Sequence, residues 1–367
     1  MSKSTKHLLV GSAESYSGKS ATILGIALQL VQAGLDIAYG KPLETCTGPV
    51  EAEGADSSER DDDVQFIAQT LQLDESKIRP TVLSLNEKVI QDRMGGTNQI
   101  DYQARLSQYL DMNGSDCVLL EGPGTLAEGQ LFGLSLQQAA RTLDAKTLVV
   151  ARYHSALVVE SILETKRQLG DRLLGVLIND VPDADREMVE KTVCPFLENQ
   201  DIPVFGVMPR NAILRSVSVG ELVKQLDAEV LCCPDRMDLM VESLTIGAMN
   251  VNSALKYFRK AHNMAVVTGG DRTDLQLAAL ETSTHCLILT GHLPPKDTVK
   301  QRAEDLEIPV LSVDLDTLTT VEIIDQTFGQ VRLHEAIKVA CIRDLMTEYF
   351  DMKRFMDAVG LEFAVTA

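Results

Sequence analysis

Residues 11–20 read Gly-Ser-Ala-Glu-Ser-Tyr-Ser-Gly-Lys-Ser, which is the most informative stretch of the chain. A short apolar run at residues 7–11 leads into it, and residues 19–32 carry apolar side chains at helical spacing. A glycine-bearing loop between a buried strand and a helix is the usual position of a phosphate-binding loop, because the free N–H groups of the helix N-terminus attract an anion. The stretch therefore predicts a strand–loop–helix unit that binds phosphate.

The loop supplies five candidate ligand-binding residues. Gly11, Ser15 and Gly18 are placed to line the phosphates. The ammonium group of Lys19 would reach the outer phosphates, and the hydroxyl of Ser20 would ligate Mg²⁺. The strict motif has glycine at position 13, where this chain has alanine. An ordinary strand–helix turn is therefore the alternative interpretation.

Five further short apolar runs follow in the first half of the chain, and helical segments separate them. They lie at residues 36–39, 117–120, 147–150, 174–178 and 204–207. Strands that are apolar on both faces and alternate with helices predict a parallel sheet that helices cover on both sides. The first half is thus predicted to be an α/β domain.

A second α/β series follows a boundary in the polar segment 210–218, with apolar runs at residues 265–267, 287–289 and 310–313. Residues 333–359 carry an apolar side chain every three or four positions, which predicts one long helix. We predict three parts: a first domain over 1–214, a smaller α/β domain over 215–330 and a C-terminal helix over 331–367.

Charged residues follow three predicted strands or loops of the first domain. Lys41 would place a positive charge beside the γ-phosphate, where negative charge develops during phosphoryl transfer. The carboxylates of Asp63 and Glu121 could hold Mg²⁺ directly or through water. Lys41 could instead be a surface lysine, and Asp63 could simply favour the start of a helix. Glu121 ends an apolar strand and needs a partner there.

The order of these motifs resembles dethiobiotin synthetase and the related cobyrinic-acid amide synthases. Lys41-Pro42, the aspartates of residues 61–63 and the Glu-Gly-Pro-Gly of residues 121–124 follow the loop in the family's order. The resemblance implies a P-loop NTPase-like fold, ATP and Mg²⁺ as cofactors, Lys41 as a catalytic residue and Asn179 at the adenine base. The family's serine-rich substrate loop is replaced at residues 43–47, so the nucleotide scaffold matches better than the substrate site.

The second domain contains another strand–turn–helix, at residues 265–274. Gly269 and Gly270 predict a sharp turn with positive φ, and Asp271 is placed to cap the next helix. Arg272 could offer a planar fork to an anion, so Gly270 and Arg272 are candidate ligand-binding residues. A purely structural cap, with Arg272 in a salt bridge between the two domains, is the alternative.

This segment resembles the DRTGG domain, which the family context links to regulation and dimer contacts. A P-loop domain followed by a DRTGG domain and a helix resembles the N-terminal region of long bacterial phosphate acetyltransferases, over essentially the whole chain. In those enzymes the acetyl-transfer domain comes next. The resemblance therefore implies that these 367 residues alone do not transfer acetyl groups.

Composition excludes several classes of function. The net charge of −19 disfavours a nucleic-acid partner, which would require basic clusters. No apolar stretch approaches the roughly 20 residues of a membrane span. The seven cysteines form no CxxC pair, so reduced thiols and a cytoplasmic location are predicted.

Two functions of different class fit these observations. The first is a nucleotide-responsive regulatory or scaffolding protein, with a nucleotide or other small-molecule ligand and a metabolic enzyme as a candidate partner. The second is an ATP-dependent ligase of the dethiobiotin or cobyrinate type, and a ligand-free oligomer is a third possibility. We also predict a homo-oligomer, because the C-terminal helix carries large apolar side chains near a chain end: Tyr349, Phe350, Met352, Phe355 and Met356.

Overall fold

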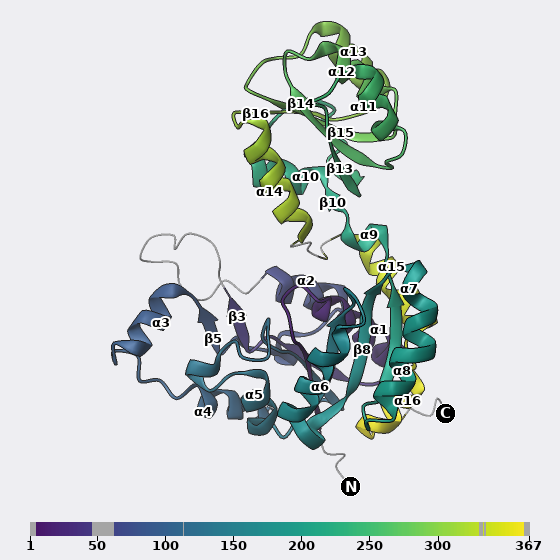
Figure 1. The fold of residues 1–367 in the computed structure, drawn as a ribbon. Coiled ribbons are helices and arrows are strands. Elements are labelled where there is room, and N and C mark those ends of the chain that lie inside the picture. Colours follow the sequence, from purple (N-terminus) through teal and green to yellow (C-terminus); the bar gives the residue numbers. More distant parts are fainter. Residues whose placement is uncertain (1–4, 46–61, 113, 330–332, 334, 363–367) are drawn as a thin grey trace. The chain divides into compact units, whose positions relative to one another are not determined.

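The computed structural model describes residues 5–45, 62–112, 114–329, 333 and 335–362. The chain forms two compact units (Figure 1). The first combines Met1–Arg210 with Leu333–Ala367, and the second is Asn211–Arg332. The predicted third part, residues 331–367, is thus not separate, because the C-terminal segment returns to the first unit.

A seven-stranded sheet forms the centre of the first unit, in the order β4-β2-β6-β1-β7-β8-β9. All its neighbouring strands are parallel, with Leu9 opposite Leu120 and Val10 opposite Leu148, for example. The predicted parallel α/β fold is confirmed. The strands are β1 (Lys6–Ser12), β2 (Ile37–Gly40), β4 (Ile78–Arg79), β6 (Cys117–Glu121), β7 (Lys146–Arg152), β8 (Leu173–Val181) and β9 (Val204–Pro209).

Helices cover both faces of this sheet. Successive side chains of a strand point to opposite faces, so Leu9 joins the core beneath one set of helices while Leu8 and Val10 face the other. The first set comprises α4 (Tyr102–Ser107), α5 (Leu136–Thr142), α6 (Val158–Leu169) and the run α7 (Asp183–Met188), π-helix Val189–Val193 and α8 (Cys194–Glu198). Helix α1 (Lys19–Gln32) packs against β1, β6 and α15 (Ala336–Tyr349). The remaining elements are α2 (Asp62–Thr70), α3 (Glu87–Met94) and the parallel pair β3 (Leu43–Thr45) and β5 (Leu83–Leu85).

The C-terminal segment differs from its prediction in two ways. The expected single helix is broken at Phe350, which is extended, into α15 and α16 (Met352–Val359). At the break Phe350 bridges Gly206 of the edge strand β9, and Asp351 N donates to Phe205 O over 2.7 Å. The helix cannot continue where its backbone joins the edge of a sheet.

The apolar side chains of this segment are buried rather than exposed. Phe355 and Met356 are 0% exposed and Phe350 is 6% exposed, because they pack within the first unit. Arg354 fixes the segment further, donating from both terminal nitrogens to Glu198 over 2.7 and 2.8 Å. This packing covers three of the five apolar side chains on which the oligomer prediction rested, so the homo-oligomer and its interface at this segment stay predictions without that support.

The second unit has a five-stranded sheet in the order β11-β16-β15-β14-β13. Strands β13 to β16 are parallel, and β11 runs antiparallel to β16. One core lies beneath α11–α13 and another beneath α10 and α14. The bounds are α9 (Ala212–Arg215), β10 (Val217–Ser218), α10 (Val219–Leu226), β11 (Glu229–Cys232), β12 (Met240–Val241), β13 (Ser243–Ile246), α11 (Val251–Phe258), β14 (Met264–Gly269), α12 (Thr273–Leu280), β15 (Thr284–Thr290), α13 (Asp297–Asp305), β16 (Val310–Val313) and α14 (Thr317–Gly329).

The cysteines and the apolar helices bear on two expectations from the sequence. Six of the seven cysteines lie in the described residues and are free thiols, while Cys46 lies outside those residues. Among the helices that the structure describes, none is long and apolar enough to cross a membrane.

Candidate phosphate-binding site

The predicted site residues of the first unit converge because its strands are parallel and end at one edge. The loop follows β1, Lys41 follows β2, Glu121 ends β6 and Asn179 lies near the end of β8. In the sheet order, β6 and β7 flank β1. Ligands of open α/β sheets bind at this carboxyl edge, so the topology favours a site over the β1 loop.

The loop is held in shape by its backbone and by Asn179. Gly18 precedes α1 with φ 100°, a left-handed conformation that favours glycine. A Cβ at Gly18 would lie under 3.0 Å from Nδ2 of Asn179. That Nδ2 donates to the carbonyl of Ser17 over 2.8 Å. The structure therefore places Asn179 against the loop; its predicted contact with adenine stays a prediction.

Lys19 is buried at the base of the loop. Lys19 is only 7% exposed, and its Nζ donates to Oγ of Ser12 over 3.2 Å. Burial lowers the pKa of Lys19, while the nearby carboxylates of Glu121 and Glu128 raise it and Lys41 lowers it. The hydroxyl of Ser17 is buried too, and it has no hydrogen-bond partner within the described part of the chain. These two groups suit an anionic ligand.

Two of the three predicted Mg²⁺ ligands are in contact. Ser20 Oγ donates to Oε1 of Glu121 over 2.9 Å, and the hydroxyl of Tyr39 donates to Oε2 over 3.2 Å. Asp63 instead lies 3.6 Å from Nζ of Lys41. Among the described residues, no three His, Cys, Asp or Glu side chains are grouped to hold a metal. Mg²⁺ usually keeps several waters and takes one or two carboxylates plus phosphate oxygens, so Ser20 and Glu121 fit such an ion.

Sequence reasoning missed Glu128. Its carboxylate accepts from the backbone N–H of Gly124 and, over 2.6 Å, from Oγ1 of Thr45. A Cβ on Gly124 would lie 2.7 Å from Oε2 of Glu128 and 3.0 Å from Oγ of Ser15, so glycine is required there for close approach. Likewise a Cβ on Gly11 would overlap Leu136. Glu128 follows the predicted motif in an irregular loop, where no sequence pattern indicates it.

Three ion pairs near the loop edge of the sheet were also not predicted. Glu14, within the loop, accepts from Nε2 of His154 over 3.0 Å when that imidazole carries the proton. Asp180 accepts from Nε of Arg152 over 3.1 Å and from Nε of Arg210 over 3.0 Å. Each pair joins residues in or after different strands, so only the folded sheet brings them together.

In the second unit the predicted turn forms for a different reason. Neither Gly269 nor Gly270 has a positive φ, and Asp271 does not cap α12, whose N-cap residue is Arg272. Gly270 is needed for close packing instead, because a Cβ there would overlap the carbonyl oxygen of Leu293. Arg272 donates to Asp274 over 3.3 Å and to the Met249 carbonyl over 3.2 Å, both within the second unit rather than across the domains as the structural alternative expects. Ligand binding by Gly270 and Arg272 stays a prediction.

Replacing Gly270 by alanine is expected to destabilise the second unit. Leu293 presents a backbone oxygen that cannot move aside, and overpacking of this kind costs about 1–3 kcal/mol. Gly269→Ala is the matched control, because its Cβ would lie 2.6 Å from Oδ1 of Asp271, a side chain that can rotate away. Urea unfolding followed by circular dichroism measures both variants. Equal midpoints for the two would contradict the argument.

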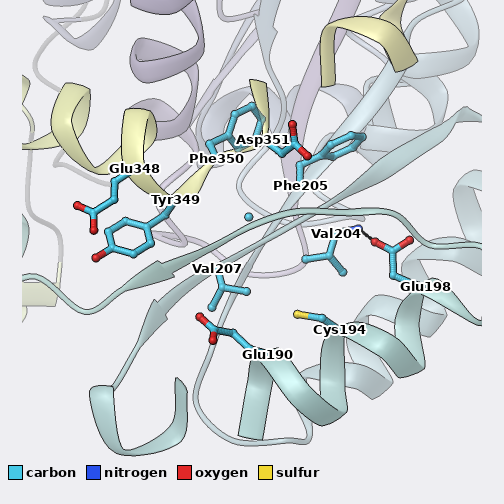
Figure 2. A pocket seen from close by; sticks show the side chains of 11 residues that line it. Glu190, Cys194, Glu198, Val204, Phe205, Val207, Glu348, Tyr349, Phe350 and Asp351 are labelled. Carbon is cyan, nitrogen blue, oxygen red and sulfur yellow. Dashed lines mark hydrogen bonds between the residues drawn. The ribbon is translucent and has the colours of Figure 1, made fainter. Parts of the chain in front are cut away.

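One pocket of about 390 Å³ lies apart from the phosphate-binding loop and the other predicted ligand-binding residues (Figure 2). It lies beside the edge strand β9, between α8 and the break that separates α15 from α16. Its wall contains no predicted site residue. The lining residues are Glu190, Cys194, Glu198, Val204, Phe205, Gly206, Val207, Glu348, Tyr349, Phe350 and Asp351. Glu190 and Glu198 are already paired with Arg186 and Arg354.

Comparisons with known proteins agree with the two units. The AAA domain family model matches residues 6–218, and the DRTGG domain model matches residues 221–327. The phosphate acetyltransferase of Nitratidesulfovibrio vulgaris is 26% identical over 369 aligned residues, which cover 95% of this chain and 51% of that protein. The phosphate acetyltransferase of Synechocystis sp. is 25% identical, over 82% of this chain and 44% of its own length. The chain thus spans about half the length of the curated relatives it matches.

Among solved structures, the CBS and DRTGG domains of the regulatory region of Clostridium perfringens pyrophosphatase, complexed with diadenosine tetraphosphate, are 17% identical. That match covers 43% of this chain and 82% of the other, with a TM-score of 0.29. Together the family models and the curated relatives confirm the predicted P-loop and DRTGG domains and the predicted similarity to phosphate acetyltransferases.

Proposed function

The chain belongs to the AAA domain family, and we propose that its first unit binds ATP with Mg²⁺ as the sensing part of a regulatory or scaffolding protein. The observation that supports this most is the buried ammonium group of Lys19. Among the described residues it hydrogen-bonds to a neutral hydroxyl and forms no ion pair. A buried cation without a paired anion is costly, and a phosphate would supply the missing charge.

The surroundings of Lys19 suit a nucleotide triphosphate. The unpartnered hydroxyl of Ser17 and the N–H groups at the start of α1 would donate to phosphate oxygens. Ser20 and Glu121 would hold Mg²⁺, which neutralises phosphate charge when bound. Lys41 follows β2 at the same edge of the sheet, and its charge lowers the pKa of Lys19. It would hold this positive charge near the outer phosphate.

A regulatory role fits the two domains of this chain better than a catalytic one. The second unit is a DRTGG domain, and we propose that it takes a nucleotide or other small-molecule ligand near Gly270 and Arg272. Acetyl transfer is the activity of the full-length relatives, of which this chain spans about half. A metabolic enzyme is the proposed partner, and a homo-oligomer is the proposed assembly. The alternative ligase would need the same nucleotide site and, in addition, a site for its acceptor.

Glu121→Gln is expected to remove most of the Mg²⁺ dependence of ATP binding. At constant ATP, adding Mg²⁺ should raise the melting temperature of the wild type further, because the carboxylate of Glu121 binds the ion beside Ser20. The amide keeps the size of the side chain and one acceptor oxygen but loses the charge and the second acceptor, so we expect at least about tenfold weaker Mg²⁺ affinity. A thermal-shift titration with Mg²⁺ measures this change.

The control for this titration is Glu164→Gln. Glu164 lies on α6, is partly exposed and pairs with Arg167 within its own helix. The melting temperature of this variant should respond to Mg²⁺ as that of the wild type does. An unchanged Mg²⁺ response in the Glu121 variant would remove Glu121 from the proposed ion site, while leaving nucleotide binding itself to be judged at Lys19.

A further inference from the structure

The second unit is inserted into the first, so the chain crosses between them twice. The outgoing crossing follows β9, which ends at Pro209, and the chain returns to the first unit at Leu333 and enters α15. Because β9 is parallel to the other strands, it ends at the sheet edge that carries the phosphate-binding loop. The outgoing crossing therefore starts at the same sheet edge as the proposed nucleotide site, with β7 and β8 between β9 and β1.

Hydrogen bonds connect the outgoing crossing to the loop. Arg210, the last residue of the first segment, donates from its backbone to the Val181 carbonyl over 2.7 Å and from Nε to Asp180 over 3.0 Å. Asp180 follows Asn179, whose amide donates to the Ser17 carbonyl in the loop. A movement of the Ser17 carbonyl would thus be transmitted to Arg210 through the adjacent residues Asn179 and Asp180.

The backbone at Asp180 limits how this connection can relax. Its φ is 61°, a left-handed conformation that costs energy for a residue other than glycine and persists only when its surroundings impose it. Here two arginines impose it, because Arg152 donates to Oδ2 and Arg210 to Oδ1. We call these three residues, Arg152, Asp180 and Arg210, the Asp180 clamp.

The returning crossing leads into α15, which packs against α1, the helix that follows the loop. Helix α1 begins with Lys19 and Ser20, and its Gly25 is packed so closely against α15 that a Cβ would overlap Met346. Met346 is 3% exposed and Ile342 is 2% exposed in this contact. Packed helices move as rigid elements, so α1 cannot shift along its axis without displacing α15.

We propose that the nucleotide site and the second unit are coupled through these two crossings, with the Asp180 clamp as the outgoing link. The inference rests on the proposed function and adds the route by which the bound nucleotide is sensed. Phe350 bridges Gly206 of β9, so the two crossing segments are also bonded to each other. Coupling is reciprocal, so a ligand of the second unit changes nucleotide affinity by the same factor.

Hydrogen–deuterium exchange of the full chain, with and without saturating Mg–ATP, tests the coupling. In the wild type we expect exchange to slow in peptides covering residues 205–215 and 336–349, by at least about fivefold, the lower end of the range for coupled sites. In Arg210→Ala the melting temperature should still rise with Mg–ATP, but the slowing at residues 205–215 should be lost. Arg172→Ala is the matched control, since Arg172 pairs with Asp144 at the opposite edge of the sheet.

Each outcome decides between the two proposals. If the wild type binds Mg–ATP and neither peptide changes, the coupling is refuted and the proposed function stands. If Arg210→Ala responds like the wild type, or Arg172→Ala loses the response equally, the clamp is not the link and the inference fails. If the wild type does not bind Mg–ATP, both proposals fall together.

Discussion

Saturating Mg–ATP is expected to raise the melting temperature of the first unit, and Lys19→Ala is expected to abolish the rise. A ligand at about 100 times its Kd stabilises the native state by about 2.7 kcal/mol, which corresponds to roughly 5–10 °C for a domain of this size. Lys19 supplies the buried positive charge of the loop, 7% exposed and bonded to Ser12. Thermal shift in the presence and absence of Mg–ATP measures the effect.

The control for this prediction is Lys146→Ala. Lys146 begins β7, at the opposite end of the strands from the loop, and is exposed to solvent. Its variant should show the same rise as the wild type. Because Lys19 is buried, circular dichroism of the ligand-free Lys19 variant must first show that it is folded. A wild type that does not respond to millimolar Mg–ATP, or a Lys19 variant that responds fully, would refute nucleotide binding at this loop.

The fold of the first unit could be predicted because its signals are local. The loop and its two flanking elements lie within residues 6–32, and each further strand is a short apolar run. Parallel pairing then brings strand ends together, which is why Ser20 and Glu121 meet although 101 positions separate them. Strand-end residues are therefore predictable as a set, even when the distances between them are not.

Contacts that depend on irregular loops could not be predicted. Glu128 reaches Gly124 and Thr45 from a loop without a motif, and the Asp180 clamp requires the register of β7, β8 and β9. The glycines of the second unit show the same limit. Sequence suggested positive φ at Gly270, whereas the structure requires glycine there because Leu293 packs against it. A glycine in the sequence does not reveal whether the structure needs its positive φ or its lack of a Cβ atom.

The C-terminal segment illustrates a related ambiguity. Its apolar stripe predicts burial but does not identify the surface that covers it, because a stripe of this kind fits another subunit as well as the same chain. In the structure that surface is the first unit itself: the rings of Phe205 and Phe355 lie 5.5 Å apart, and those of Phe350 and Phe355 lie 5.3 Å apart. Intramolecular packing thus accounts for the burial of these rings, and a subunit interface at this segment stays a prediction.

Phe355→Ala is expected to destabilise the first unit by about 3–5 kcal/mol, the usual cost of removing a buried phenylalanine ring. Phe355 is 0% exposed and contacts both Phe205 of β9 and Phe350, so its loss would leave a cavity where α16 meets the sheet. Phe196→Ala is the matched control, because Phe196 on α8 is 42% exposed and its loss should cost within about 0.5 kcal/mol.

The two units can unfold separately, so the measurement must assign each transition. Urea unfolding followed by circular dichroism serves this purpose, because Gly270→Ala marks the transition of the second unit by shifting it alone. Phe355→Ala should shift the other transition to lower urea, in a manner independent of protein concentration. If Phe355→Ala matches the Phe196 control, the segment is not part of the core of the first unit. A loss of stability that instead depends on protein concentration would restore the C-terminal segment as a subunit interface.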